Sequence, residues 1–196
     1  MKKSVVIIIV VVIVVIAVVA FLVPKYNGLV KLEEGVTTAW SNVEGQYQRR
    51  ADLIPNLVNT VKGYAEHESE TLQEVVEARG KATSINIEAD ELNEESIAQY
   101  QAAQSELSSA LGRLIAISES YPDLKANENF RDLQVQLEGT ENRIAESRRA
   151  YNETVQSYNV KVRSFPTNIV AGLFGFEKKA QFKAEAGTEK APTVEF

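Results

Sequence analysis

Apolar residues follow two patterns along the chain, first an unbroken run and then a helical repeat. Residues 5–23 are nineteen consecutive positions without a charge, a hydrogen-bonding side chain or a glycine. As a helix rising ~1.5 Å per residue, the run extends roughly 28 Å, close to the ~30 Å hydrocarbon thickness of a bilayer. It is longer than the about 7–15 apolar residues of a cleaved secretory signal and has no small-x-small cleavage site. We expect a transmembrane signal anchor over residues 1–25 that contacts lipid through residues 5–23, and a cleaved signal is the alternative.

The repeat that follows predicts long amphipathic helices. Between residues 26 and 80 the apolar positions recur at steps of three and four, which predicts one continuous helix. Pro55 is expected to kink it, and a sharp break there, folding the first part back as a fourth helix, is the alternative. A loop over residues 81–90 and a second helix from Glu91 to just before Ser120 follow. The third helix carries apolar residues seven apart over five heptads: Phe130, Leu137, Ile144, Tyr151, Tyr158 and Phe165.

These patterns predict an all-α protein, in which an N-terminal transmembrane helix leads into an antiparallel, four-helix-bundle-like domain of three long helices and a short C-terminal helix. The bundle is expected over residues 26–176, and residues 177–196, which lack periodicity, as a flexible tail. A second helix of this length does not reach back beyond Arg50, which leaves the apolar stripe over residues 29–47, with Trp40, uncovered. We therefore expect this stripe to pair with a second copy of the chain or with a partner protein.

Charge narrows the possible partners. Lys2, Lys3 and Lys25 are the only charges before residue 26, so 18 of the 21 basic residues and all 27 acidic residues follow, a net charge of −9. This balance argues against a nucleic-acid partner and against lying flat on anionic lipid. The chain has no cysteine, which excludes disulfides, thiolate metal sites and cysteine nucleophiles.

Lysines flank the apolar run evenly, two before it and two (Lys25 and Lys31) after it, so the positive-inside rule barely decides the orientation. A short basic leader before a long apolar run is typical of a signal anchor. We therefore expect a single-pass protein of the cell membrane, with its N-terminus in the cytoplasm and its bundle on the extracytoplasmic side.

Candidate chemistry is sparse. His67 is the only histidine and lies between Glu66 and Glu68, whereas a catalytic zinc site needs three protein ligands. No glycine-rich phosphate loop follows a strand pattern, and the serines lack a nucleophile turn. We predict no catalytic, cofactor-binding or metal-binding residue. The alternative is a metal-dependent hydrolase, or another enzyme, that uses His67 and nearby carboxylates.

Five residues on or beside the apolar stripes are candidates for an interaction site or a polar core: Trp40, Arg50, Glu68, Glu141 and Arg148. Counting helical rises places Arg148 level with Glu68 if the first and third helices run parallel, so we expect these two side chains to meet. One interpretation is a ligand or register site shared with Glu141 and Arg50. The simpler one is that the four charged side chains extend to the rim of the stripe.

Several motifs resemble those of the LemA family of bacterial membrane proteins. They include residues 49–58 (RRADLIPNLV), 61–65 (VKGYA), 121–126 (YPDLKA), 140–145 (TENRIA) and 148–152 (RRAYN). The resemblance extends over nearly the whole chain and implies a single N-terminal transmembrane helix and a mainly helical bundle. It supplies no activity, because the family is one without an established biochemical function.

The sequence therefore favours a membrane-anchored, non-catalytic helical-bundle protein that acts as a protein-interaction or scaffold module at the cell envelope. Its expected partners are a homo-oligomer or another membrane protein.

Overall fold

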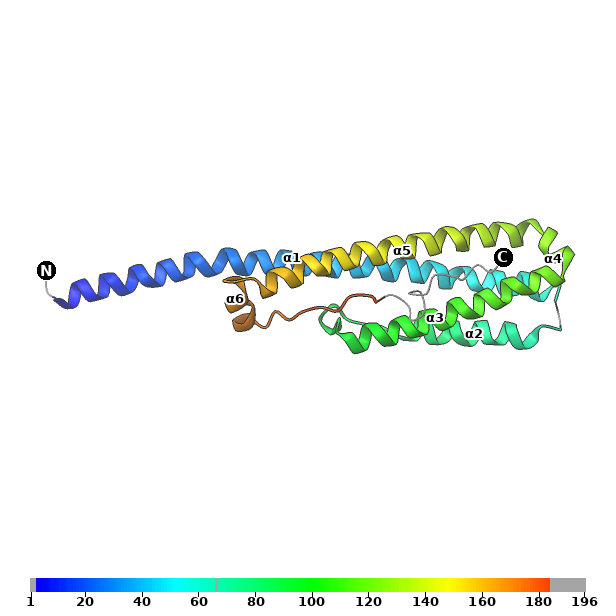
Figure 1. Ribbon diagram of the computed structural model, residues 1–196, viewed down its shortest axis with the longest axis horizontal. Coiled ribbons are helices and arrows are strands. Elements are labelled where there is room, and N and C mark those ends of the chain that lie inside the picture. The colour runs from blue at the N-terminus through cyan, green and yellow to red at the C-terminus, as the bar shows by residue number, and fades with distance from the viewer. Residues whose placement is uncertain (1–2, 66, 184–196) are drawn as a thin grey trace, which may run out of the picture.

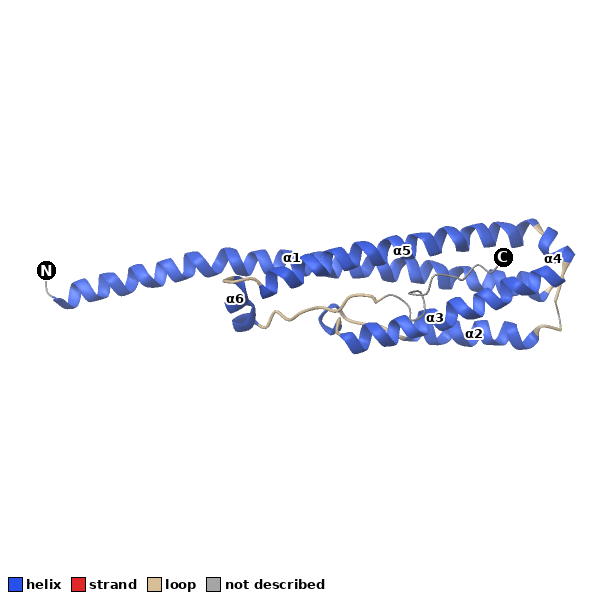
Figure 2. Ribbon diagram, viewed as in Figure 1, coloured by secondary structure: helices blue, strands red, loops and turns tan. Residues whose placement is uncertain are grey.

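The computed structural model describes residues 3–65 and 67–183, and every regular element within them is helical (Figures 1 and 2). This confirms the all-α class that the sequence predicts. The elements, in chain order, are α1 (Lys3–Lys62), α2 (Ser69–Ser84), the 3-10 turn η1 (Ala89–Glu91), α3 (Glu94–Ile117), the 3-10 turn η2 (Ser118–Ser120), α4 (Pro122–Ala126), α5 (Glu128–Arg163) and α6 (Thr167–Phe174).

The first part of α1 stands outside the bundle (Figure 1). Its large apolar side chains from Val6 to Val19 are 42–63% exposed. Among the described helices, α1 is the one that is long and apolar enough to cross a membrane. It continues through both Pro24 and Pro55, so the predicted alternative of a sharp break at Pro55 is wrong. The apolar run and the first bundle helix are therefore parts of one continuous helix.

Four helices form an antiparallel bundle, because α1, α2, α3 and α5 alternate in direction (Figure 1). Backbone packing is most extensive between α1 and α5 and between α2 and α3, and α2 also packs on α1. The bundle thus consists of two helix pairs. The seam between α3 and α5 lies where these pairs meet.

The stretch predicted as one helix over residues 26–80 is two helices. α1 ends at Lys62, and the carbonyl of Val61 then accepts hydrogen bonds from the backbone N–H groups of Tyr64 and Ala65 at 3.0 and 2.9 Å. The chain reverses and α2 begins at Ser69. Val61, Ala65 and Leu72 are buried in the same core on both sides of this turn. The apolar repeat therefore continues through the reversal and does not reveal it.

The buried side chains form two separate cores. The distal core, at the end of the bundle far from the apolar run, is mainly aliphatic and includes Ile54, Leu57, Val61, Leu72, Val75, Leu107, Leu111, Leu114, Leu124, Phe130 and Leu137. The proximal core, beside the apolar run, is rich in aromatic rings and includes Leu29, Val36, Trp40, Tyr47, Tyr100, Tyr151, Val155, Tyr158 and Phe182.

The apolar stripe over residues 29–47 is covered within the chain, so the prediction that it lacks an intramolecular partner is wrong. Leu29 is 0% and Trp40 2% exposed. α5 is 36 residues long, and its second half reaches back alongside this stripe, where the Tyr158 hydroxyl donates to Glu33 of α1 at 3.3 Å. The stripe therefore gives no reason to expect an oligomeric stalk.

The described part of the predicted tail is packed against the bundle. Residues 177–183, here called the C-terminal segment, run in extended form between α3 and α5, and Phe182 is only 6% exposed. The prediction of a flexible tail is thus wrong for these residues, and the bundle continues to at least residue 183. Residues 184–196 lie outside the described residues.

Candidate interaction site between α3 and α5

Arg50 of α1 is buried to 1% exposure at the level between the two cores. Its Nη1 donates to Glu141 Oε1 of α5 at 2.8 Å and to Ser108 Oγ of α3 at 2.7 Å. Its Nη2 donates to the side-chain oxygen of Gln104 at 2.6 Å, and Gln104 Nε2 donates onward to the carbonyl of Ala82 in α2 at 3.1 Å. The planar guanidinium, with donors in a fixed fork, therefore joins all four bundle helices.

Two more of the predicted residues lie near Arg50. Glu141 is 46% exposed, so its ion pair with Arg50 lies at the rim, where solvent weakens it. The Arg148 guanidinium lies 4.8 Å from the centre of the Phe182 ring, and its Nη2 donates to the Lys183 carbonyl at 3.3 Å. Arg50, Glu141 and Arg148 line one cavity of about 60 Å³, far below the roughly 300–1,000 Å³ of metabolite pockets. The cluster is therefore suited to fixing helices rather than to binding a small molecule.

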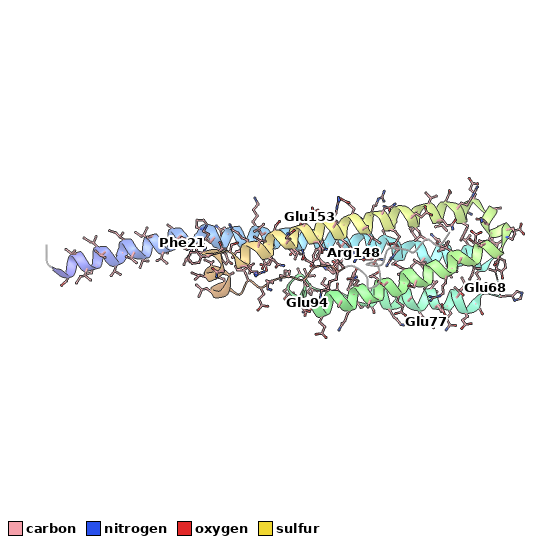
Figure 3. The ribbon with its side chains drawn as sticks, in the orientation of Figure 1. Phe21, Glu68, Glu77, Glu94, Arg148 and Glu153 are labelled. Carbon is pink, nitrogen blue, oxygen red and sulfur yellow. The ribbon has the colours of Figure 1, made fainter. Side chains whose placement is uncertain are left out.

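The predicted pairing of Glu68 with Arg148 is wrong. Glu68 lies at the distal tip, where its Oε1 accepts a hydrogen bond from the Tyr121 hydroxyl at 3.1 Å, and Arg148 lies midway along α5 (Figure 3). The register count assumed that the first helix runs to Gly80. Because the chain reverses after Lys62, Glu68 belongs to the turn instead.

The described residues contain no set of metal ligands that would support the enzyme alternative. His67 is exposed at the distal tip, and Glu66 lies outside the described residues. Within residues 3–65 and 67–183, no group of three or more His, Cys, Asp or Glu side chains is placed to hold a metal ion.

Two asparagines of α5 hold the C-terminal segment, and each of them forms hydrogen bonds with both the backbone N–H and the carbonyl of one residue. Asn159 Oδ1 accepts from the N–H of Lys179 at 3.0 Å, and its Nδ2 donates to the carbonyl of the same residue at 2.8 Å. Asn152 does the same with Phe182, at 2.9 and 3.0 Å. Seven residues of helix rise roughly 10 Å, and three residues of extended chain span a similar length. The spacing of the two side-chain amides on α5 therefore matches backbone hydrogen bonds to every third residue of an extended chain.

Side-chain contacts add to this backbone grip. The Phe182 ring stacks on Trp40 with centroids 6.0 Å apart and meets Tyr151 edge-on at 5.4 Å. Lys179 Nζ donates to the Ala89 carbonyl at 3.1 Å and lies 3.7 Å from Glu33 Oε1. The groove between α3 and α5 that holds the C-terminal segment thus combines three features. They are the two asparagine side chains, here called the amide clamps, an aromatic pocket around Phe182 and acceptors for the Lys179 ammonium group.

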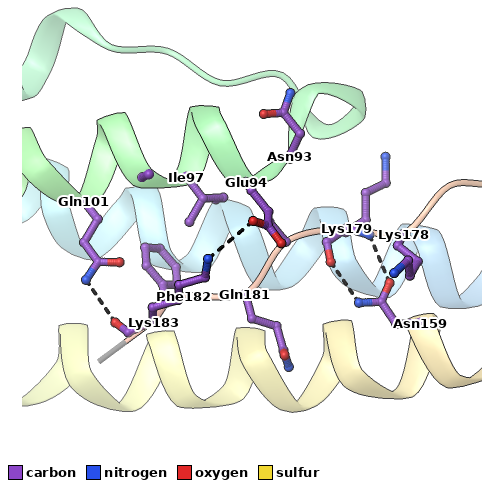
Figure 4. Close-up of a pocket in the computed structure, with 12 residues that line it drawn as sticks. Asn93, Glu94, Ile97, Gln101, Asn159, Lys178, Lys179, Gln181, Phe182 and Lys183 are labelled. Carbon is purple, nitrogen blue, oxygen red and sulfur yellow. Dashed lines mark hydrogen bonds and ion pairs between the residues drawn. The ribbon is translucent and has the colours of Figure 1, made fainter. Parts of the chain in front are cut away.

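The α3 side of the groove is less closely packed (Figure 4). Gln101 Nε2 donates to the Lys183 carbonyl at 3.0 Å, and Lys183 Nζ lies 3.4 Å from Glu94. A hollow of about 500 Å³ remains beside the segment, lined by Asn93, which precedes α3, and by α3 residues that include Ile97 and Ala98. A second hollow of about 470 Å³ lies farther along the seam, between Leu111 and Leu137. The seam is therefore longer than the segment that occupies it.

Buried tyrosines line the α5 wall of the groove. The Tyr151 hydroxyl donates to the Ala180 carbonyl at 2.9 Å. Burial raises the pKa of Tyr151 well above its ordinary value, and burial is also the main cause of the raised pKa values of Tyr47, Tyr100 and Tyr158. These hydroxyls therefore stay protonated, and able to donate hydrogen bonds, to a higher pH than the hydroxyl of an exposed tyrosine.

Comparison with known proteins places this bundle in a family. The sequence model of the LemA family matches residues 39–196, which include Arg50, α3, α5 and the C-terminal segment. The chain belongs to the LemA family. This confirms the resemblance of the sequence motifs.

Several relatives of this LemA-family protein match over most of their length. Magnetosome protein MamQ 2 of Paramagnetospirillum magneticum is 30% identical over 91% of this chain and 71% of its own. Magnetosome protein MamQ of Magnetospirillum gryphiswaldense is 29% identical over 85% and 67%, and protein LemA of Metamycoplasma hominis is 28% identical over 83% and 70%. None of these names states an enzymatic activity. Together with the apolar N-terminal helix, the matches indicate a membrane-associated protein.

The groove of this LemA-family protein was missed by the sequence analysis, although a signal was present. Within α5 the dipeptide Tyr-Asn occurs twice, at Tyr151-Asn152 and Tyr158-Asn159, seven residues apart on one helix face. A repeated amide beside a heptad core position indicates a polar ladder at the edge of the core. The sequence pattern did not identify residues 177–183 as the segment that binds these asparagines, because the contact joins residues that are far apart in the sequence.

Proposed function

We propose that this LemA-family protein is a single-pass, non-catalytic interaction module of the cell envelope whose α3–α5 groove binds extended protein segments. In this proposal the N-terminus is cytoplasmic and the bundle extracytoplasmic. The observation that carries it is the double clamp, in which Asn152 and Asn159 each bind both the N–H and the carbonyl of one residue.

Backbone recognition suits a partner-binding role. Side-chain amides that pair with a peptide unit supply affinity for any extended chain, as added strands do in β-augmentation, while side-chain pockets supply selectivity. Here the selective features are the aromatic pocket around Phe182 and the acceptors around Lys179. The preferred ligand is therefore an extended segment with a lysine three residues before an aromatic residue.

In the described structure, the protein's own C-terminal segment occupies the groove. A second copy carries the same segment, so exchange between copies would produce a homo-oligomer without any new type of contact. A membrane-protein partner with a similar exposed segment would compete for the same clamps. Both expected kinds of partner would therefore compete with the chain's own C-terminal segment for the groove.

The test uses a fluorescent peptide with the sequence of residues 177–183 and the detergent-solubilised full chain. Phe182→Ala weakens the hold on the chain's own segment, so the peptide is expected to bind this variant with increased fluorescence anisotropy. Adding Asn152→Leu and Asn159→Leu should abolish this binding. Asn142→Leu, at an exposed position on α5, is the matched control and should leave it unchanged.

The peptide itself provides a second control. N-methylation at the position of Phe182 removes the N–H that Asn152 accepts, so it should abolish binding, whereas N-methylation at Lys178 should have little effect. Equal binding of the two methylated peptides would contradict recognition through the backbone. Equal binding to the clamp variant and to the Asn142→Leu control would contradict the groove itself.

Membrane orientation is tested separately. Protease added to intact spheroplasts should digest the bundle if it lies outside the cytoplasm. Full protection of the bundle would show the opposite orientation.

A further inference from the structure

Four large apolar side chains in and just before α6 are more than half exposed. Phe165 is 81%, Ile169 59%, Leu173 68% and Phe174 51% exposed. Ile169 and Leu173 are one turn apart and share a face of α6, whereas Thr167, Val170 and Ala171 are buried on the bundle side. Exposed apolar side chains grouped on a soluble surface commonly mark an interaction site.

This face lies where the apolar run of α1 ends (Figure 1). The Tyr26 ring meets the rings of Phe174 and Phe176 edge-on, with centroids 4.9 and 5.6 Å apart. Leu22, in the last turn of the apolar run, packs against the proximal core. α6 and the end of the predicted membrane span are therefore neighbours in space.

The depth of α6 follows from the helix rise. Tyr26 is three residues beyond the end of the apolar run, about 4.5 Å along α1. The polar layer on each side of the hydrocarbon core is roughly 5–7 Å thick, so the ring contact between Tyr26 and Phe174 lies within it when α1 spans the bilayer. Amphipathic helices at this level bury an apolar face ~5–10 Å deep, and aromatic side chains are enriched there.

We infer that α6 lies in the surface of the same bilayer that α1 crosses, with Ile169 and Leu173 and the preceding Phe165 inserted among the lipids. Arg163 is exposed in the last turn of α5, two residues before Phe165, and in this arrangement its guanidinium would be available to the headgroup phosphates. The bundle thus has two membrane contacts, and the second sets its rotation and tilt about α1. The inference rests on α1 spanning the membrane and is independent of the α3–α5 groove.

The absence of cysteine from the sequence allows a direct measurement of depth. Single cysteines are introduced into the full chain at Leu173, at Val12 in the apolar run and at Val135, which is 66% exposed on the distal part of α5. Each variant is labelled with a nitroxide and reconstituted into vesicles of phosphatidylcholine and phosphatidylglycerol. Collision rates with oxygen and with a polar nickel complex are then compared by electron paramagnetic resonance.

The ratio of oxygen to nickel collisions at position 173 is expected to be severalfold higher than at 135 and lower than at 12. A ratio at 173 equal to that at 135 would place α6 in water and overturn the inference. Low collision rates with both reagents would indicate a protein contact, such as a second copy, and would overturn it too. An aqueous ratio at 12 would instead remove the membrane-spanning premise, with no bearing on the groove. Ile169→Cys repeats the test at a second position on the same face.

Discussion

The two halves of the bundle bury their cores in different ways. In the distal half, aliphatic side chains from regular helices pack against one another. In the proximal half, α1 and α5 extend beyond their neighbours, because α2 has 16 residues and α3 has 24 against 36 in α5. Aromatic rings, the connection before α3, α6 and the C-terminal segment cover the remaining surface.

This difference distinguishes packing by whole helices from packing by a short extended segment. A bundle helix cannot leave the distal core without unfolding the domain. The C-terminal segment, in contrast, is held by side-chain amides and one buried aromatic ring, and under the proposed function another extended chain that makes the same bonds would replace it. The Arg50 cluster lies between the two halves, and its hydrogen bonds link the four bundle helices to one another.

The largest difference between the halves is expected at alkaline pH. Burial raises the pKa values of Tyr100, Tyr151 and Tyr158, which all lie in the proximal core. Unfolded tyrosine loses its proton near pH ~10 while the folded residues keep theirs, so the unfolded state binds fewer protons and stability falls as the pH rises above that value. The emission of Trp40, the only tryptophan, should therefore shift at a lower pH than helical circular dichroism declines. Simultaneous changes would show that the halves do not differ in this way.

Truncation of the central aromatic residue should cost nearly as much. Trp40 packs against Tyr100, Tyr151 and Phe182, and its indole N–H donates to the Ile87 carbonyl at 3.2 Å. Trp40→Ala is expected to lower the free energy of unfolding by about 3–5 kcal/mol, measured by urea titration in detergent. Val135→Ala, at an exposed position, serves as the control and should change it by less than ~0.5 kcal/mol. Equal effects of the two substitutions would contradict a packed proximal core.

The Arg50 cluster should give an intermediate and asymmetric effect. Arg50→Ala leaves buried Gln104 without its cation, so a loss of roughly 3 kcal/mol is expected. Glu141→Ala should cost only about 1 kcal/mol, because Glu141 is half exposed and Arg50 keeps its bonds to Ser108 and Gln104. Urea unfolding of the two variants measures the difference. Equal losses would mean that the ion pair, rather than the network with α3, holds the helices together.

The smallest effect is expected at an exposed pair in the distal half. Arg113 Nη2 lies 2.9 Å from Glu74 Oε2, and the two side chains are 56% and 44% exposed. Arg113→Ala should change the free energy of unfolding by less than ~1 kcal/mol, and added salt should reduce the effect further. A loss as large as that of Arg50→Ala would show that surface charge, not burial, dominates the stability of the bundle.

Periodicity predicted the helical parts of this fold, and it failed both where the repeat continues through a turn and where the chain has no repeat. The heptads from Phe130 onward correctly indicated α5, because that helix buries one face along its length. The reversal after Lys62 was missed because the same core receives apolar residues from both sides of the turn. Arg50 and Glu141 were recognised as polar members of the stripes, but their contact and its partners on α3 depend on how α2 folds back. The C-terminal segment has no repeat at all, and the hydrogen bonds and ring contacts that hold it are non-local.

The central claim is that the C-terminal segment closes the proximal half without being needed by the distal half. Hydrogen–deuterium exchange of the full chain tests it, by comparing Asn152→Leu/Asn159→Leu with the Asn142→Leu control. Amide exchange should increase severalfold in residues 177–183 and in the proximal turns of α3 and α5, while α2 and the distal turns of α1 keep their protection. Unchanged exchange in residues 177–183, or an equal loss of protection in both halves, would contradict the account.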